Sequence, residues 1–232
     1  MSTIKWTKSD FLALMLIPIQ FIIARVLAFM QVLHMKNTVL VIAFALGLLS
    51  VGILAKIYGA TLVNDWAEYR KKIWLKILFS ILGAGCIIAI LSVVRLLMSQ
   101  FIPVTSSSTV GEIEAVSMPF AIILIVAVIP LINALQEEII FRHVLFYKLR
   151  GTKYISVIFF LVSAFLFGIV HLNNFNGNFI ATIPYMTIGM FFNLVYLFTK
   201  NIWYSIGIHL TFNFVMGFLP TLFVHVVQNF IA

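Results

Sequence analysis

Two adjacent carboxylates stand at the end of a long apolar run. Glu137 and Glu138 follow residues 121–135 and are the last acidic residues of the chain. Ionisable side chains at membrane depth are costly and usually functional. Arg142 lies about one helical turn after Glu138, so an ion pair can offset part of the cost of burying that carboxylate. Glu137 has no such local partner and is the better candidate for a proton-accepting role; the alternative is that both carboxylates are solvated at the membrane interface.

Three further polar side chains stand in or beside apolar runs of the C-terminal half. His171 ends the run 159–170, and His209 and Asn213 are four positions apart, which places them on one helix face. A carboxylate paired with an imidazole can take a proton from water, while a second imidazole and an amide N–H can stabilise an oxyanion at a carbonyl. This set of groups predicts hydrolysis by activated water, without a serine or cysteine nucleophile.

Membrane-spanning helices must position these residues. Hydrophobic residues make up 63% of the 232 positions and charged residues 9%, against roughly 25% charged residues in a soluble domain, which excludes a water-soluble fold. Apolar runs long enough to cross a hydrocarbon core of about 30 Å recur along the whole chain. We therefore predict an all-α fold, a polytopic membrane helix bundle of seven or eight transmembrane helices. The predicted spans lie near 11–33, 38–58, 77–98, 119–141, 154–171 and 180–199, with a final apolar stretch at 203–231.

Charges between the spans predict the orientation in the membrane. Basic residues gather in alternate connections, at Lys5 and Lys8, at 70–76, at 142–153 and at Lys200. The positive-inside rule then puts the N-terminus of this multi-pass cell membrane protein in the cytoplasm. The net charge of +8 follows from this topology, so we expect membrane lipid and no nucleic acid as a partner.

A polar segment at 99–118 divides the chain. It has no basic residue and is expected to be a linker outside the cell. We predict N-terminal transmembrane helices and this linker over 1–118, and a catalytic-type transmembrane core over 119–232. Gly217 and Pro220 in the last apolar stretch favour a kink or a break, which leaves seven and eight spans both open.

Three short motifs give the C-terminal half a resemblance to a known family. They are EExxxR from Glu137 to Arg142, FxxxH from Phe167 to His171, and HxxxN from His209 to Asn213. In this order they resemble the CAAX protease and bacteriocin-processing family (CPBP, or Abi) of intramembrane proteases, which includes the Ras-converting enzyme. The resemblance covers roughly residues 119–217.

The resemblance implies a role for each motif residue. The implied roles are water activation by Glu137 and His171, an oxyanion pocket of His209 and Asn213, and support of these groups by Glu138, Arg142 and Phe167. A metal is an open alternative, because two histidines and a glutamate are a common catalytic zinc set with water in the fourth position. If a divalent metal such as zinc is bound, its ligands would be Glu137, His171 and His209.

The depths of these residues conflict with a layout of straight spans. Glu137 and His209 would lie at similar shallow depths from the cytoplasmic edge, whereas His171 would lie near the far end of its span. Either the segment 142–153 is partly embedded as a continuing helix, or the fifth span is shorter and tilted around a deep cavity. In both cases we expect a cavity open to cytoplasmic water.

The predicted function is that of an intramembrane endopeptidase. This hydrolase would cleave a membrane-associated peptide or protein substrate, either of CAAX type or a bacteriocin or pheromone precursor. The resemblance also implies a role in bacteriocin self-immunity, and the amino-acid usage indicates a bacterial source. The alternative is a non-enzymatic membrane immunity protein or a small transporter, in which Glu137, Arg142 and His209 form a buried polar network or a proton relay.

Overall fold

Every regular element in the described part of the chain is helical. The computed structural model describes residues 7–32, 36–101, 118–148 and 153–230. Segments η3 and η6 are π-helical, and η4 and η5 are single turns of 3₁₀-helix. The elements in chain order are α1 (Lys8–Val32), α2 (Lys36–Tyr69), α3 (Ile73–Leu97), α5 (Phe120–Glu137), η3 (Glu138–Tyr147), α6 (Lys153–Ile169), η4 (Leu172–Phe175), η5 (Ile180–Thr182), α7 (Ile183–Thr199), α8 (Ile202–Asn213), η6 (Phe214–Phe218) and α9 (Leu219–Phe230).

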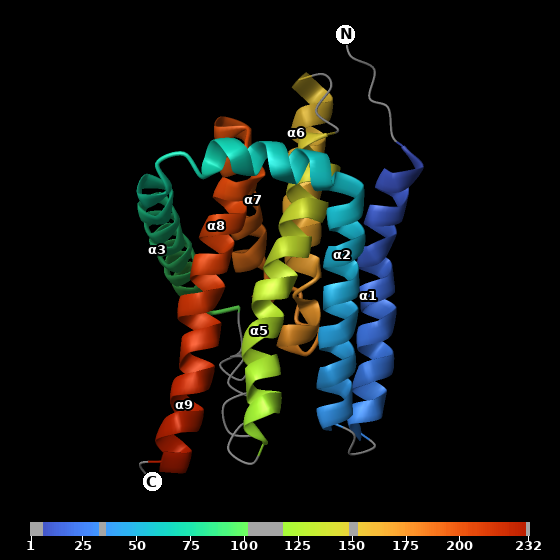
Figure 1. The fold of residues 1–232 in the computed structure, drawn as a ribbon, viewed down its shortest axis with the longest axis vertical. Coiled ribbons are helices and arrows are strands. Elements are labelled where there is room, and N and C mark those ends of the chain that lie inside the picture. Colours follow the sequence, from blue (N-terminus) through green and yellow to red (C-terminus); the bar gives the residue numbers. More distant parts are fainter. Residues whose placement is uncertain (1–6, 33–35, 102–117, 149–152, 231–232) are drawn as a thin grey trace.

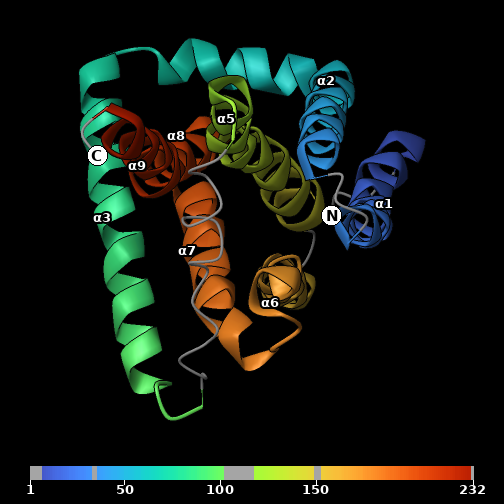
Figure 2. The same cartoon turned by 90° about the horizontal axis from the view of Figure 1, so that it is seen from below.

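The helices form a membrane bundle, as predicted. Most of them run along its long axis, while the C-terminal part of α2 crosses one end (Figure 1). Seen from below, α5, α7 and α8 lie between α3 on one side and α1 and α2 on the other (Figure 2). Five helical segments of the described chain are long and apolar enough to cross a membrane, and the helix over Tyr154–Ile169 is apolar but shorter. The predicted number of seven or eight spans stays a prediction.

The fourth span continues beyond the predicted boundary at residue 141. It runs from Phe120 to Tyr147, and Arg142 inside it is fully buried. The prediction that a basic connection begins at Arg142 is therefore wrong, and this connection begins near Lys148. The helix continues because Arg142 is paired inside the bundle and Val144, Leu145 and Phe146 are buried around it.

This longer helix explains how Glu137 and His171 can lie at similar depths. Of the two arrangements expected from the sequence, the continuing helix is found: the chain after Arg142 forms η3. The next helix, α6, is also short, with 17 residues, and ends at Ile169, so His171 lies in the turn that follows. The length of η3 and the shortness of α6 together bring His171 toward the level of Glu137.

The last apolar stretch is one continuous helical path. Helix α8 passes through the π-helical η6 into α9 without a break, although Pro220 stands at the second position of α9. Proline lacks an N–H, and its ring crowds the carbonyl four residues earlier. The wider π-helical turn directly before Pro220 accommodates both effects, as π-bulges do at kinks.

Small residues let the helices around η3 approach one another closely. A Cβ at Gly189 of α7 would lie 2.9 Å from the Cα of Ala164 in α6. Gly207 of α8 leaves room for the hydroxyl groups of Tyr69 and Ser80. Close contacts at small residues are typical of membrane helices, whose association depends on van der Waals packing.

The start of α8 is fixed by side chains of α2. The carboxylate of Asp65 accepts a hydrogen bond of 2.9 Å from the Ile202 backbone N–H. Asn201 caps the helix by accepting from the Trp203 N–H at 3.0 Å, and its amide donates to the Asp65 carbonyl at 2.7 Å. An N-cap of this kind satisfies donors that a helix start leaves free. The register of α8, and hence the position of His209, is set from this end.

The basic connections lie together at one end of the bundle. The α2–α3 connection with Arg70 to Lys72, Lys148 after η3, and Lys200 between α7 and α8 are all at the end where α2 crosses (Figure 1). This grouping agrees with the alternation seen in the sequence. The cytoplasmic location of this end stays a prediction.

Candidate active site

The site is built where α5 passes into η3. Glu137 is the last residue of α5, and Glu138 is the first residue of η3. A π-helix closes i→i+5 hydrogen bonds, is rare, and occurs frequently at functional sites. The side chain of Glu138 is fully buried, whereas that of Glu137 is 19% exposed. Two neighbouring carboxylates therefore have different surroundings, one inside the bundle and one at its inner surface.

Glu138 contacts both Arg142 and His209. Its Oε2 lies 3.4 Å from Nε of Arg142, and its Oε1 lies 3.0 Å from Nδ1 of His209. The Glu138 oxygens face a guanidinium and an imidazole and act as acceptors, so Nδ1 of His209 carries the hydrogen. This contact orients the imidazole with Nε2 toward Glu137, as carboxylates orient histidines in many active sites.

Arg142 is surrounded by aromatic rings. Its guanidinium carbon lies 4.3 Å from the ring centre of Phe167, 5.1 Å from that of Phe192 and 5.8 Å from that of Phe141. Within the described chain none of its three side-chain nitrogens has a hydrogen-bond partner. The ion pair with Glu138 and the aromatic faces therefore carry the stabilisation of this buried charge.

His209 faces the second carboxylate. Its Nε2 lies 3.9 Å from Oε2 of Glu137, which is too long for a direct hydrogen bond and suits a bridging water. The ring stacks on Phe192 with centres 4.9 Å apart and planes at 27°, and Phe167 stands edge-on at 6.0 Å. Contacts on the ring face and at Nδ1 leave His209 with little freedom to turn away from Glu137.

Glu137 lines a cavity of about 380 Å³ between α1, α2, α5 and the end of α6. Its walls are mostly apolar, with Leu16 and Ile23 of α1 and Leu46 of α2 among the lining residues. Leu46 lies in the half of α2 that is further from the basic end of the bundle. The lining residues therefore do not show an opening at the basic end, and the expected opening to cytoplasmic water stays a prediction.

The His171 ring is held in place by Phe167 and Tyr185. Its Nδ1 lies 2.8 Å from the carbonyl oxygen of Phe167, one turn earlier. A carbonyl oxygen only accepts, so Nδ1 carries the hydrogen, and in the neutral ring Nε2 keeps a lone pair. The ring stacks on Tyr185 with centres 4.2 Å apart and planes at 26°, and it contacts the Phe167 ring at 5.0 Å. Phe167 thereby connects His171 to Arg142 and His209, which explains why an aromatic residue stands at this position.

Asn213 lies one helical turn after His209, as expected, but makes a different contact from the one implied. Its Nδ2 donates a 2.8 Å hydrogen bond to the backbone carbonyl of Pro130 in α5. This bond ties α8 to α5 below the carboxylates. A role for Asn213 in an oxyanion pocket stays a prediction, with one N–H of the amide already used.

A three-ligand metal site is not assembled by these side chains as they stand. Among the described residues, no group of three or more His, Cys, Asp or Glu is arranged to hold a metal ion. Glu137 and His209 face each other, while His171 is held by Phe167 and Tyr185. The zinc alternative stays an untested prediction, with Glu137, His171 and His209 as its ligands.

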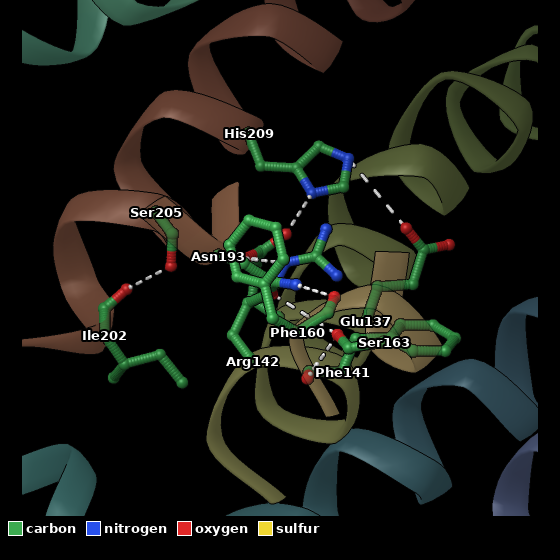
Figure 3. Close-up of polar contacts among 10 residues, drawn as sticks. Glu137, Phe141, Arg142, Phe160, Ser163, Asn193, Ile202, Ser205 and His209 are labelled. Carbon is green, nitrogen blue, oxygen red and sulfur yellow. Dashed lines mark hydrogen bonds and ion pairs between the residues drawn. The ribbon is translucent and has the colours of Figure 1, made fainter. Parts of the chain in front are cut away.

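Sequence reasoning missed several residues that hold the site. Ser163 of α6 donates to the Phe141 carbonyl at 2.8 Å and lies 3.2 Å from the Asn193 amide oxygen (Figure 3). Asn193 of α7 donates to the Phe160 carbonyl at 2.8 Å. Polar residues inside apolar runs were the available signal for Ser163 and Asn193. Phe192 carried no signal, since one more phenylalanine in an apolar helix is not distinctive.

The fold and the site together define a class. This is a polytopic helical membrane protein with a carboxylate–imidazole site inside its bundle. Residues 119–215 match the family model described as type II CAAX prenyl endopeptidase, Rce1-like. The match includes all three motifs and confirms the resemblance of this part of the chain to CAAX-type membrane endopeptidases. No curated protein and no solved structure matches the chain.

Proposed function

We propose that the protein is an intramembrane endopeptidase that hydrolyses a peptide bond of a membrane-associated substrate with water activated at Glu137. The observation that carries the proposal is the arrangement of Glu137 at the wall of an apolar cavity, opposite a histidine that a buried carboxylate orients. The match of residues 119–215 to the Rce1-like family model supports a CAAX-type substrate. A bacteriocin or pheromone precursor, and a role in self-immunity, are narrower proposals that rest on the family alone.

The chemistry can be assigned to this chain's own groups. Glu137 accepts a proton from water, and His171 offers a lone pair at Nε2 that can accept a second hydrogen bond from that water. When His209 carries both ring hydrogens, its Nε2–H can donate to the oxyanion formed at the attacked carbonyl. Glu138 and Arg142 act through His209, whose orientation they hold. If a divalent metal is bound, it would polarise the water and the carbonyl at the same place.

The test is cleavage of a fluorogenic farnesylated CAAX-type peptide and of a panel of secreted-peptide precursors, in detergent or liposomes. Glu137→Gln is isosteric and removes the proton acceptor, so cleavage should fall by 10²-fold or more, the range of general acid–base catalysis. Glu68→Gln is a matched control, because Glu68 is exposed and pairs only with Lys71 at the surface. The same assay with a chelator tests the metal.

Equal cleavage by wild type and Glu137→Gln would contradict the proposed mechanism. Absence of cleavage of every substrate, together with a Glu137→Gln variant that still functions in cells, would favour the non-enzymatic membrane protein. Loss of cleavage in Glu137→Gln alone, with normal expression of both variants, would support the endopeptidase.

A further inference from the structure

The lining of the cavity beside Glu137 is of two chemical kinds. Most of it consists of aliphatic side chains from α1 and α2, together with Ile129 and Val170. The rest, apart from Glu137, is mainly carboxamides. Four of them line the cavity: Asn133, Gln136, Asn173 and Asn174. A purely hydrocarbon ligand would not need carboxamides, and polar groups at membrane depth cost free energy unless they form hydrogen bonds.

Asn133 and Gln136 are arranged as a pair. The Gln136 Nε2 donates a 2.9 Å hydrogen bond to the Asn133 Oδ1. Asn133 also has two N–H donors, and the structure gives them no partner within the described chain. Asn133 stands four residues before Glu137 on α5, so both side chains lie on the same helix face and line the same cavity.

Asn173 and Asn174 line the same cavity from another element. They belong to η4, which follows His171, and both are exposed. The cavity that Glu137 lines thus holds amide groups from two separate elements, α5 and η4. Amide groups are both donors and acceptors and match the backbone of an extended peptide, whose N–H and C=O groups need partners when they leave water.

We propose that Asn133 is a substrate-positioning residue that donates a hydrogen bond to a backbone carbonyl of the peptide next to the bond held at Glu137. Gln136 orients Asn133 for this contact, and Asn173 and Asn174 complete a carboxamide subsite for the peptide backbone. The aliphatic part of the cavity lining accommodates the apolar part of the same substrate. This inference rests on the proposed function, because it assigns the site a peptide.

The experiment measures binding separately from cleavage. In the cleavage-deficient Glu137→Gln background, affinity is measured for two probes: a farnesylated CAAX-type peptide and farnesol, which has the same hydrocarbon and no peptide. Asn133→Ala removes both donors, and Asn133→Asp keeps the shape but not the donors. Asn37→Ala is the matched control, since Asn37 is exposed at the far end of α2. A lost neutral hydrogen bond corresponds to roughly a 3- to 10-fold weaker affinity.

The expected result is weaker peptide binding in both Asn133 variants, with unchanged farnesol binding and no effect of Asn37→Ala. In the active background the same variants should raise KM by a similar factor and leave kcat within about 2-fold. Unchanged peptide binding overturns the inference, and so does an equal loss for both probes, which would mean a disturbed cavity. Failure of the proposed function is distinct: Glu137→Gln would then cleave like the wild type, whatever Asn133 does.

Discussion

At the residue scale, the site depends on one buried carboxylate with two partners. Glu138 contacts Arg142 and His209 at once, and neither Glu138 nor Arg142 has any exposed side-chain surface. A buried ion pair contributes little net stability compared with apolar residues of the same size, but removing one partner leaves an uncompensated charge. We therefore explain the Glu138–Arg142 pair by its role in orienting His209, and not by a gain in stability.

Glu138→Gln tests this explanation. The neutral amide leaves the Arg142 charge unpaired, so the free energy of unfolding should fall by about 3–5 kcal/mol. Cleavage should also fall, because a neutral amide oxygen accepts a weaker hydrogen bond from His209 than the carboxylate does. Thermal unfolding in detergent and the peptide assay measure the two effects. The double variant Glu138→Leu/Arg142→Leu should regain much of the stability and none of the cleavage. Cleavage restored in the double variant would show that the pair does not orient His209.

The sequence motifs predicted much of this residue-scale arrangement. The spacing of Glu138 and Arg142 predicted their ion pair, and the structure places His209 between the two carboxylates as a shared site requires. The contact of Asn213 with Pro130 could not be predicted, because it depends on how two distant helices pack. For the same reason the stacking of Phe192 on His209 could not be predicted from the sequence.

At the element scale, the π-helix η3 is the feature that hydropathy did not predict. A charged residue ends an apolar run in any hydropathy profile, so the span was placed up to residue 141. The helix continues because the charge is compensated within the bundle and because side chains of α6 and α7 support its backbone. Ser163 reaches the Phe141 carbonyl, and Asn193 is within hydrogen-bonding distance of Ser163.

Ser163→Ala tests the support of η3. Loss of this buried hydroxyl leaves the Phe141 carbonyl without that donor, so we expect the free energy of unfolding to fall by about 1–3 kcal/mol and kcat to fall with the altered position of Arg142. Ser205→Ala is the matched control, since Ser205 is equally buried but donates only to Ile202 within its own helix. Equal effects of the two substitutions on kcat would contradict a special role for η3.

At the scale of the whole molecule, a polar cluster helps to attach α1 to the C-terminal core. Lys148, directly after η3, lies 2.6 and 2.8 Å from the two carboxylate oxygens of Asp10, and the Tyr58 hydroxyl of α2 donates to the same carboxylate at 2.8 Å. Thr7 donates to it from its backbone and its hydroxyl. Helices α1 and α2, whose purpose no sequence motif indicated, line the cavity, and this cluster anchors both of them to the end of η3.

The Asp10 cluster makes stability depend on pH. Burial alone would raise the pKa of Asp10, but hydrogen bonds from Lys148, Thr7 and Tyr58 outweigh it and lower the pKa from 3.8 to about 2. Because the folded pKa lies below the unfolded one, the stabilisation is fully present above about pH 4 and is lost as the pH falls toward 2; its size is about 2 kcal/mol. Unfolding in detergent between pH 6 and pH 2 should show this loss in wild type and not in Asp10→Asn. Parallel curves would contradict the role of Asp10.

The clustering of basic residues at one end predicts the orientation of the whole bundle in the membrane. Lys71 lies in the α2–α3 connection at that end, and Asn37 lies at the opposite end of α2; both side chains are exposed. In a Cys86→Ser background, which removes the exposed thiol, we expect a membrane-impermeant maleimide to label Asn37→Cys in intact cells and Lys71→Cys only after permeabilisation. The reason is the free-energy cost of moving basic loops across the membrane. The reverse pattern would place the basic end outside and contradict the predicted cytoplasmic N-terminus.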